Sequence, residues 1–424
     1  MTAFILYNKL WVNIMNGITT TFRSLKYRNF RLFFPGLITS QIGIWIQNVA
    51  ISWVVYSLTK SPLMMGGILF INTLPLFIIT PFAGMVIDKF DRHKLLLIIQ
   101  ILFALQAFLM AFCAITNHLM LWNIITLGLF LNIVAAVDAP LRQSTYILLV
   151  DDKTDLSNAL SLNAACFNVA RLVGPAVAGI LLSAVGVAWC FTINFLCILP
   201  CVFLVMMMDF KDKKSDSAKN KSIIDGVKEG LEYAFHSPQI TTLLAFAGIF
   251  SFIALTYPLL MPIYTKEVLH SGVDILGWLM SCTGIGALCS SIFLASRTTL
   301  KGLKYILCCG AIVLSCGFIL MGFINHTLYS CITMFFVGLG FTSAITSDST
   351  LLQSILEDDK RGRIMSLYSI CFLGATSVSN LIAGSIAEFL GISYTMIIFG
   401  GILLVSTLLF AIIFYHLNFT SKIK

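Results

Sequence analysis

A single arginine within a long apolar run is the residue of this chain best suited to hold a charged ligand. Arg171 lies thirteen residues into an apolar stretch that starts near residue 158, which in a helix places it roughly 20 Å deep. If the stretch crosses a membrane, a charge there costs on the order of 2.5–3.5 kcal/mol, so we expect Arg171 to face the interior and to have a partner. That partner is either a helix carbonyl or Asp138, which is a structural role, or an anionic solute, because the planar guanidinium fits carboxylates.

Amide side chains within other apolar runs are further candidates for the wall of a central cavity. An amide at such a position either contacts a solute or forms a hydrogen bond to a neighbouring helix, and both alternatives remain open for each residue. The candidates are Gln41, Gln47, Asn48, Asn163, Asn168 and Asn380.

A residue that carries a proton must titrate, so Asp, Glu and His are the side chains to consider. We place Asp138 and Asp348 near the ends of apolar runs and Glu388 near the opposite end of another. The histidines fall in connections or at run ends, so the residues alone give little support to proton coupling.

Motifs for a cofactor, a metal or ATP are missing. There is no G-x-x-x-x-G-K-[ST] loop, and Gly284-Ile-Gly286 is half of a dinucleotide fingerprint without a strand before it. The twelve cysteines lie in apolar segments without metal-ligand spacing, so we interpret them as small hydrophobic residues. An enzyme within a membrane would need paired catalytic groups at one depth. We therefore expect no metal, no cofactor and no enzymatic activity.

The composition excludes a soluble protein. The 424 residues are 58% hydrophobic and 11% charged, whereas a soluble domain has about 25% charged residues. A soluble enzyme, a nucleic-acid-binding domain and a disordered chain are all excluded. Long apolar runs without strand alternation predict an all-α protein embedded in the lipid bilayer, and the net charge of +8 is typical of cytoplasmic loops rather than of a nucleic-acid partner.

Twelve apolar runs are long enough to span a bilayer, and a polar stretch separates the first six from the last six. We expect a cytoplasmic segment 1–31, a six-helix bundle 32–208, a cytoplasmic linker 209–239 with an amphipathic helix over 223–235, a second six-helix bundle 240–417, and a tail 418–424. The predicted spans are 32–58, 63–87, 95–116, 119–138, 158–184, 187–208, 240–264, 273–296, 303–324, 328–348, 364–390 and 392–417.

The distribution of basic residues predicts the orientation. With the N-terminus in the cytoplasm, 24 of the 27 Lys and Arg residues fall in cytoplasmic segments, and the exceptions are Lys60, Lys266 and Arg171. The positive-inside rule therefore places both termini and the linker in the cytoplasm.

The two halves repeat in sequence. Asp138 and Gln143 recur as Asp348 and Gln353, 210 residues on, and Gly179 recurs as Gly384, 205 residues on. Ser61 and Gly67 likewise match Ser271 and Gly277, and Gly186 matches Gly391. Because matching spans have the same direction, we expect two pseudo-symmetric halves that rock about a site between them.

The connection after the second span reads Gly84-Met-Val-Ile-Asp88-Lys89-Phe-Asp91-Arg92-His-Lys94. It resembles motif A of the major facilitator superfamily, with Asp91 in place of the second glycine. The resemblance implies a gating network in which Asp88 pairs with Arg92, and Arg92 also meets Asp138. The start of the eleventh span, near Arg363, would dock on this motif when the cytoplasmic side is closed.

The fifth span contains Gly174, Pro175, Ala178 and Gly179, which resemble the G-P-x-x-G-G motif C of proton-coupled antiporters, with Ala178 replacing one glycine. Small residues form a smooth helix face that a neighbour can approach closely, and Pro175 kinks the span. The resemblance favours export.

Segments along nearly the whole chain, among them Gly43-Ile-Trp45-Ile-Gln47 and Trp189-Cys-Phe191, resemble the enterobactin-exporter-like branch of bacterial efflux transporters. The resemblance implies an inner-membrane protein, working as a monomer, that exports a siderophore or drug-like solute in exchange for protons. An importer of the same fold is the alternative, and a membrane-embedded enzyme or receptor is a third reading.

Overall fold

The computed structural model describes residues 22–417 except 151, 210–230 and 298. The side chains of a few further residues within helices, including Asp88, are not described. Two short 3₁₀ turns, η1 (Arg23–Lys26) and η2 (Thr80–Phe82), accompany the α-helices. The helices of the first half are α2 (Arg28–Thr59), α3 (Pro62–Ile79), α4 (Ala83–Lys89), α5 (Arg92–Ile115), α6 (Leu121–Leu149), α7 (Lys153–Ala184) and α8 (Val187–Met206).

The second half begins after the linker. Its helices are α10 (Pro238–Ala254), α11 (Tyr257–Glu267), α12 (Val273–Ala295), α13 (Leu303–Met321), α14 (Thr327–Ile355), α15 (Asp358–Leu390) and α16 (Ile392–His416). Twelve helical segments in the described residues are long and apolar enough to cross a membrane, which confirms the predicted fold class. Most of the predicted amphipathic helix lies outside the described residues, although 231–235 are helical.

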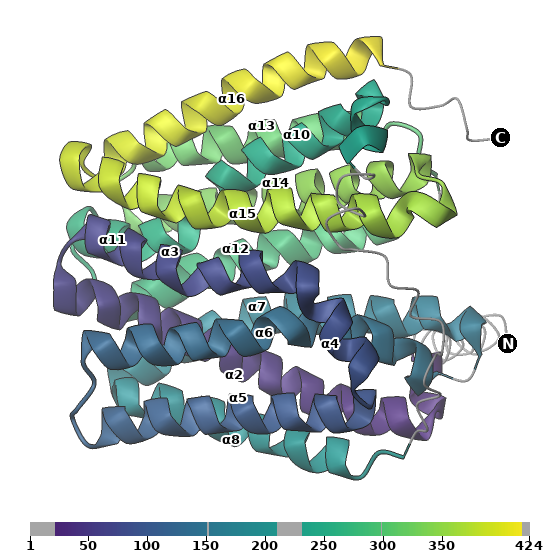
Figure 1. Cartoon of the computed structure of the whole chain (residues 1–424). Helices are drawn as coiled ribbons and strands as arrows, with labels where there is room; N and C mark the ends of the chain where they lie inside the picture. Colours follow the sequence, from purple (N-terminus) through teal and green to yellow (C-terminus); the bar gives the residue numbers. More distant parts are fainter. Residues whose placement is uncertain (1–21, 151, 210–230, 298, 418–424) are drawn as a thin grey trace, which may run out of the picture.

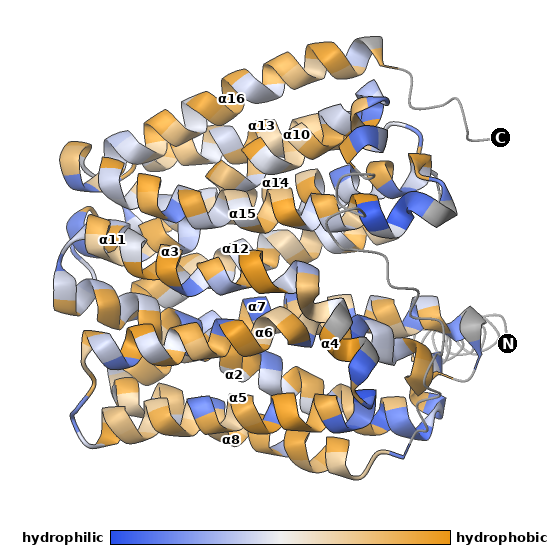
Figure 2. Ribbon diagram, in the orientation of Figure 1, coloured by the Kyte–Doolittle hydropathy of each residue, from blue (hydrophilic) through white to orange (hydrophobic). Residues whose placement is uncertain are grey.

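The two halves lie one above the other in Figure 1, with their helices roughly parallel to a common axis. The start of α2 and the end of α16 lie at one end of the bundle, which we call the termini end. The connections α2–α3, α7–α8 and α15–α16, which contain Lys60, Gly186 and Gly391, lie at the opposite end, the far end. Figure 2 shows apolar residues along the helices and hydrophilic ones gathered toward the termini end.

The backbone confirms the internal repeat. Gly186 and Gly391 have φ values of +87° and +83° in the turns after α7 and α15, a region that glycine enters without steric cost. Lys60 and His270, which precede α3 and α12, also share positive φ values of 51° and 47°. Turns 205 and 210 residues apart thus have the same unusual conformations.

Several helix ends differ from the predicted spans. The fourth and tenth spans were predicted to end at Asp138 and Asp348, but α6 continues to Leu149 and α14 to Ile355. The seventh span is divided at Leu255 and Thr256 into α10 and α11. The apolar run ends before the helix does because the last turns carry polar residues, so hydropathy underestimates the length of these helices.

The apolar core is joined across the halves only toward the far end. One buried cluster contains the core of the second half together with far-end residues of the first, such as Val55 and Met65. The other contains first-half residues nearer the termini end, such as Phe33 and Tyr146. The described halves therefore pack together at the far end and are separate in their cores at the termini end.

Candidate functional site

A cavity of about 650 Å³ lies between the halves toward the termini end. Its wall is formed by α7 on one side and by α12, α14 and the connection after α12 on the other. Two arginines, Arg171 and Arg297, line it, and none of the described lining residues is acidic. The other polar residues of the wall are Asn163, Asn168, Ser291, Thr299, Thr342, Thr346, Ser347 and Thr350.

Arg171 crosses from one half to the other. A guanidinium Nη donates a hydrogen bond of 2.9 Å to the Tyr257 hydroxyl, and the guanidinium lies 4.9 Å from the centre of the Phe341 ring. The side chain is buried as expected, but its partner is neither Asp138 nor a helix carbonyl. Its Nε is buried without a hydrogen bond to any described residue, so one donor remains for a ligand.

The amide candidates fall into two groups. Asn163 and Asn168 line the Arg171 cavity, where Asn163 accepts a hydrogen bond of 2.7 Å from Tyr146 and Asn168 donates one of 3.1 Å to Ser291. Gln47 is fully buried in a chain of amides, with bonds to Gln106 and Asn194. We therefore assign Gln47 to the packing of α2 against α5 and α8.

The remaining amides do not line either of the two cavities described here. Asn380 is buried where α15 meets α3, and its carbonyl would lie 2.4 Å from a Cβ at Gly66. Gln41 is half-buried and Asn48 is exposed on α2.

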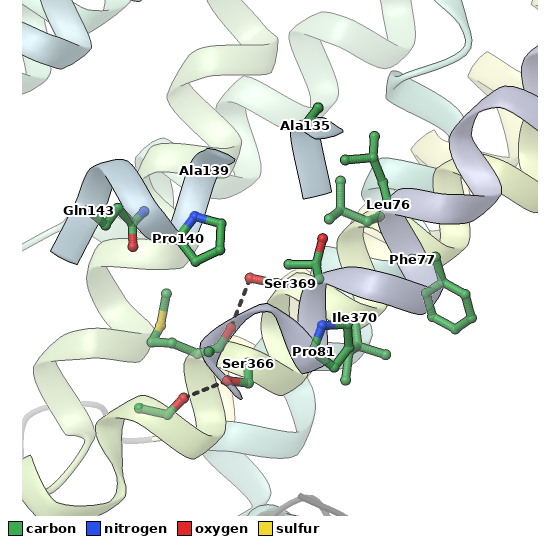
Figure 3. A pocket seen from close by; sticks show the side chains of 15 residues that line it. Leu76, Phe77, Pro81, Ala135, Ala139, Pro140, Gln143, Ser366, Ser369 and Ile370 are labelled. Carbon is green, nitrogen blue, oxygen red and sulfur yellow. Dashed lines mark hydrogen bonds between the residues drawn. The ribbon is translucent and has the colours of Figure 1, made fainter. Parts of the chain in front are cut away.

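A second cavity of about 580 Å³ separates the motif A region from α15. Figure 3 shows Leu76, Phe77 and Pro81 on one wall and Ser366, Ser369 and Ile370 on another. Gly84 and Gly362 also line it, so motif A and the start of α15 both border this cavity. The lining of this second cavity is mostly apolar, and none of its described residues is charged.

The motif A residues lie at the termini end. Asp91 caps α5 by accepting a hydrogen bond of 2.9 Å from the Lys94 amide, which explains how this chain uses the position where the family pattern has glycine. Lys89 is exposed, and Arg92 and Arg363 are half-buried. The Asp88 side chain lies outside the described residues, so its pairing with Arg92 stays a prediction.

Asp138 has a different partner from the one that the family pattern implied. Its carboxylate forms an ion pair of 2.7 Å with Arg142, one helical turn further along α6, and accepts a hydrogen bond of 3.4 Å from Gln100. Because α6 continues past Asp138, the local pairing at i and i+4 becomes possible. The expected contact with Arg92 is thus replaced by one within the same helix.

The small residues of motif C serve two contacts. Gly174 faces α2, where a Cβ would lie 2.4 Å from the Cβ of Trp45, whereas Gly179 faces Gly277 of α12, at 3.0 Å from its Cα. Gly277 also approaches the Pro175 carbonyl, and Ala178 is fully buried. Gly66 and Gly384 form the equivalent close contact between α3 and α15.

The far end is closed by polar contacts between the halves. Tyr56 donates a hydrogen bond to Glu267, and Lys266 donates one of 2.6 Å to Ser57 while its ammonium lies 4.6 Å from the centre of the Trp53 ring. Ser61 donates a further bond of 2.7 Å to Glu388. We call the contacts of Tyr56, Ser57, Lys266 and Glu267 the far-end latch.

Sequence reasoning missed several of these residues. Arg297 lies just beyond a span and was counted only as a loop charge, and Tyr257 lies 86 residues from Arg171. No local signal joins such residues, because their proximity depends on how the halves pack. Within the described residues, no group of His, Cys, Asp or Glu is arranged to hold a metal ion.

Comparisons with known proteins agree with this architecture. Residues 19–421 match the family described as transmembrane secretion effector. The staphyloferrin A transporter of Staphylococcus aureus is 28% identical over 93% of this chain and 97% of its own. The multidrug efflux pump Tap of Mycolicibacterium fortuitum is 21% identical over 85% of this chain and 89% of its own.

Solved structures share the fold. The POT family transporter PepTSo superimposes with a TM-score of 0.75 at 9% identity, covering 93% of this chain and 99% of its own. The nucleoside transporter NupG gives a TM-score of 0.72 at 14% identity, covering 92% and 100%. The matched relatives are transporters and not enzymes.

Proposed function

The chain belongs to the transmembrane secretion effector family of major facilitator superfamily transporters, and from this premise we propose that it exports a small organic anion in exchange for protons. The observation that carries the proposal is the cavity with two arginines and no acidic residue among its described lining residues. Such a wall attracts carboxylates and repels cations. A carboxylate siderophore is the class of solute that we favour, and one relative of this chain is named as a transporter of staphyloferrin A.

The mechanism is alternating access between the halves. The halves are in contact at the far end, and the cavities lie toward the termini end. We therefore interpret this conformation as open on the side of the termini. If the termini lie in the cytoplasm, as the basic residues favour, this is the state that receives a solute for export. A solute carboxylate would replace the missing acidic partner of Arg171 and use its free Nε, while Asn168 and Ser291 offer hydrogen bonds from both halves.

The second, apolar cavity favours a related candidate. A drug-like solute with a large apolar part would fit between Phe77 and Ile370, and Tap is a multidrug pump. Import by the same fold remains the alternative for direction. We place the protein in the inner membrane of a bacterium and expect it to work as a monomer.

Direction and solute class are tested together in inside-out membrane vesicles. With an acidic lumen, an exporter should accumulate added carboxylate siderophores and leave matched neutral analogues outside. Mass spectrometry of the lumen measures both. Accumulation of neutral compounds alone would contradict the anionic solute, and accumulation only in right-side-out vesicles would indicate an importer.

A further inference from the structure

Asp348 is a buried carboxyl group that no ion pair holds. It lies seven residues before the end of α14, about 10 Å from the termini end of that helix, and it is fully buried. Neither carboxyl oxygen has a hydrogen-bond partner among the described residues. The hydroxyl of Tyr368 on α15 lies beside it and interacts with the carboxyl group, although the two groups do not meet full hydrogen-bond geometry.

The internal repeat makes this position unusual. Asp138 occupies the equivalent place in the first half, and Arg142 neutralises it from four residues further on. Four residues beyond Asp348 the chain has Leu352, which is also fully buried. The first half therefore has an acid paired with an arginine, whereas the second half has the acid with a leucine in place of that arginine.

We propose that Asp348 is the proton-binding carboxyl group of the transporter, and that its protonated form stabilises the conformation open at the termini end. A carboxylate that has no counter-charge, and only a tyrosine hydroxyl beside it, is costly in an apolar interior, whereas the neutral acid is tolerated. Loss of the proton therefore favours any arrangement that gives Asp348 water or a partner. The inference rests on the alternating access proposed above.

The position of Asp348 links it to the solute site. Its neighbour Ser347 lines the Arg171 cavity, as do Thr346 and Thr350 of the same helix. A movement of α14 that exposes Asp348 would therefore also move this cavity wall. Such coupling gives antiport: the protonated carrier returns to the termini-open state, and proton release favours the outward step with solute.

The first test uses the wild-type protein in liposomes and dicyclohexylcarbodiimide, an apolar reagent that adds to protonated carboxyl groups. The carboxyl oxygen bonds to the carbodiimide carbon, and the acid proton moves to nitrogen, so nothing is released. Peptide mass spectrometry should find the adduct at Asp348 and not at Asp138, which is the internal control. Modification of Asp138 with none at Asp348 would overturn the proposal.

The second test follows conformation and needs no known solute. In a background without native cysteines, the rate at which Thr350→Cys reacts with a polar maleimide is divided by the rate of a free thiol at the same pH, because only the thiolate reacts. This relative rate should rise as the pH falls, because protonation opens the termini end. Adding Asp348→Asn should keep this relative rate high and independent of pH, and Asp274→Asn, the same change at an exposed acid, should behave as wild type.

If the labelling rate depends on pH in Asp348→Asn as it does in the wild type, the proposed role of Asp348 is refuted. If that variant does not accumulate in the membrane, the carbodiimide experiment decides. Neither readout depends on direction or solute, so failure of the proposed export leaves the outcome interpretable.

Discussion

Arg171 is the residue at which the structural and functional roles can be separated. If it binds a solute carboxylate, Arg171→Gln should remove a charged hydrogen bond worth about 1.5–3 kcal/mol and weaken the affinity for anionic solutes by about tenfold to a hundredfold. Transport of neutral solutes should remain. Arg171→Lys keeps the charge but loses the planar fork, so an intermediate loss is expected. Vesicle uptake at graded solute concentrations measures both.

A suitable control is Tyr257→Phe, which removes the hydrogen bond to Arg171 and keeps the ring. If the bond only positions the arginine, this variant should retain selectivity for anions. A parallel loss of anionic and neutral transport in Arg171→Gln, or failure of the protein to accumulate, would assign Arg171 to structure.

The sequence predicts which single residues are buried, but it does not predict which residues of other helices they contact. An arginine in a membrane helix must face the interior, and Arg171 does. Its partner Tyr257 comes from the other half, and a sequence without an alignment carries no record of that contact. Asp138 and Asp348 were placed at span ends, but each lies well inside its helix, because the polar turns that follow remain helical.

Close contact between helices of opposite halves gives a prediction for two adjacent glycines. A Cβ at Gly66 would lie 2.4 Å from the Asn380 carbonyl and 3.1 Å from the Gly384 Cα, whereas one at Gly67 meets nothing within 4 Å. Gly66→Ala should therefore push α3 and α15 apart at a cost of about 1–3 kcal/mol. Gly67→Ala should be nearly neutral.

The measurement is the labelling rate of a cysteine introduced at Thr59, whose hydrogen bonds stay within the first half, in a background without native cysteines. We expect faster labelling and reduced transport in Gly66→Ala, and wild-type behaviour in Gly67→Ala. Equal effects of the two changes would show that packing between α3 and α15 does not keep the far end closed.

Helix-scale features were largely predictable from the repeat, although not in their exact register. The match of Gly186 to Gly391 corresponds to two turns with the same positive φ. Gly67 was matched to Gly277, but Gly66 makes the contact between the halves. A one-residue offset rotates a side chain by about 100° around a helix, so sequence matching identifies the helix pair and not the contacting face.

Orientation is the first whole-molecule prediction. The count of basic residues requires the 209–221 segment to be cytoplasmic and the Asn117-His118 turn to lie outside. Alkaline phosphatase fused after His118 should be active, and the same enzyme fused within 209–221 should be inactive. The fusions control each other, because phosphatase folds only outside the cytoplasm. Activity in the linker fusion would reverse the orientation.

The far-end latch belongs to the whole molecule, because it joins the two halves. Tyr56→Phe removes a hydrogen bond to the Glu267 carboxylate and keeps the ring beneath Lys266. A bond to a charged group contributes about 1.5–3 kcal/mol, so its loss should shift the population toward a far end that is open. Labelling of a cysteine at Ser61 from outside should then accelerate by about tenfold or more.

Thr59→Val is the matched control, because the Thr59 hydroxyl donates to the Val55 carbonyl and accepts a hydrogen bond from the Ser61 amide. Both partners belong to the first half, so the change removes no hydrogen bond between the halves. It should leave the labelling rate unchanged. Glu267→Gln should resemble Tyr56→Phe, since both lose the same charged hydrogen bond. If both latch variants label at the wild-type rate, the hydrogen bond between Tyr56 and Glu267 accompanies closure of the far end without stabilising it. In that case the glycine contacts of α3 with α15 and of α7 with α12 must keep the far end closed.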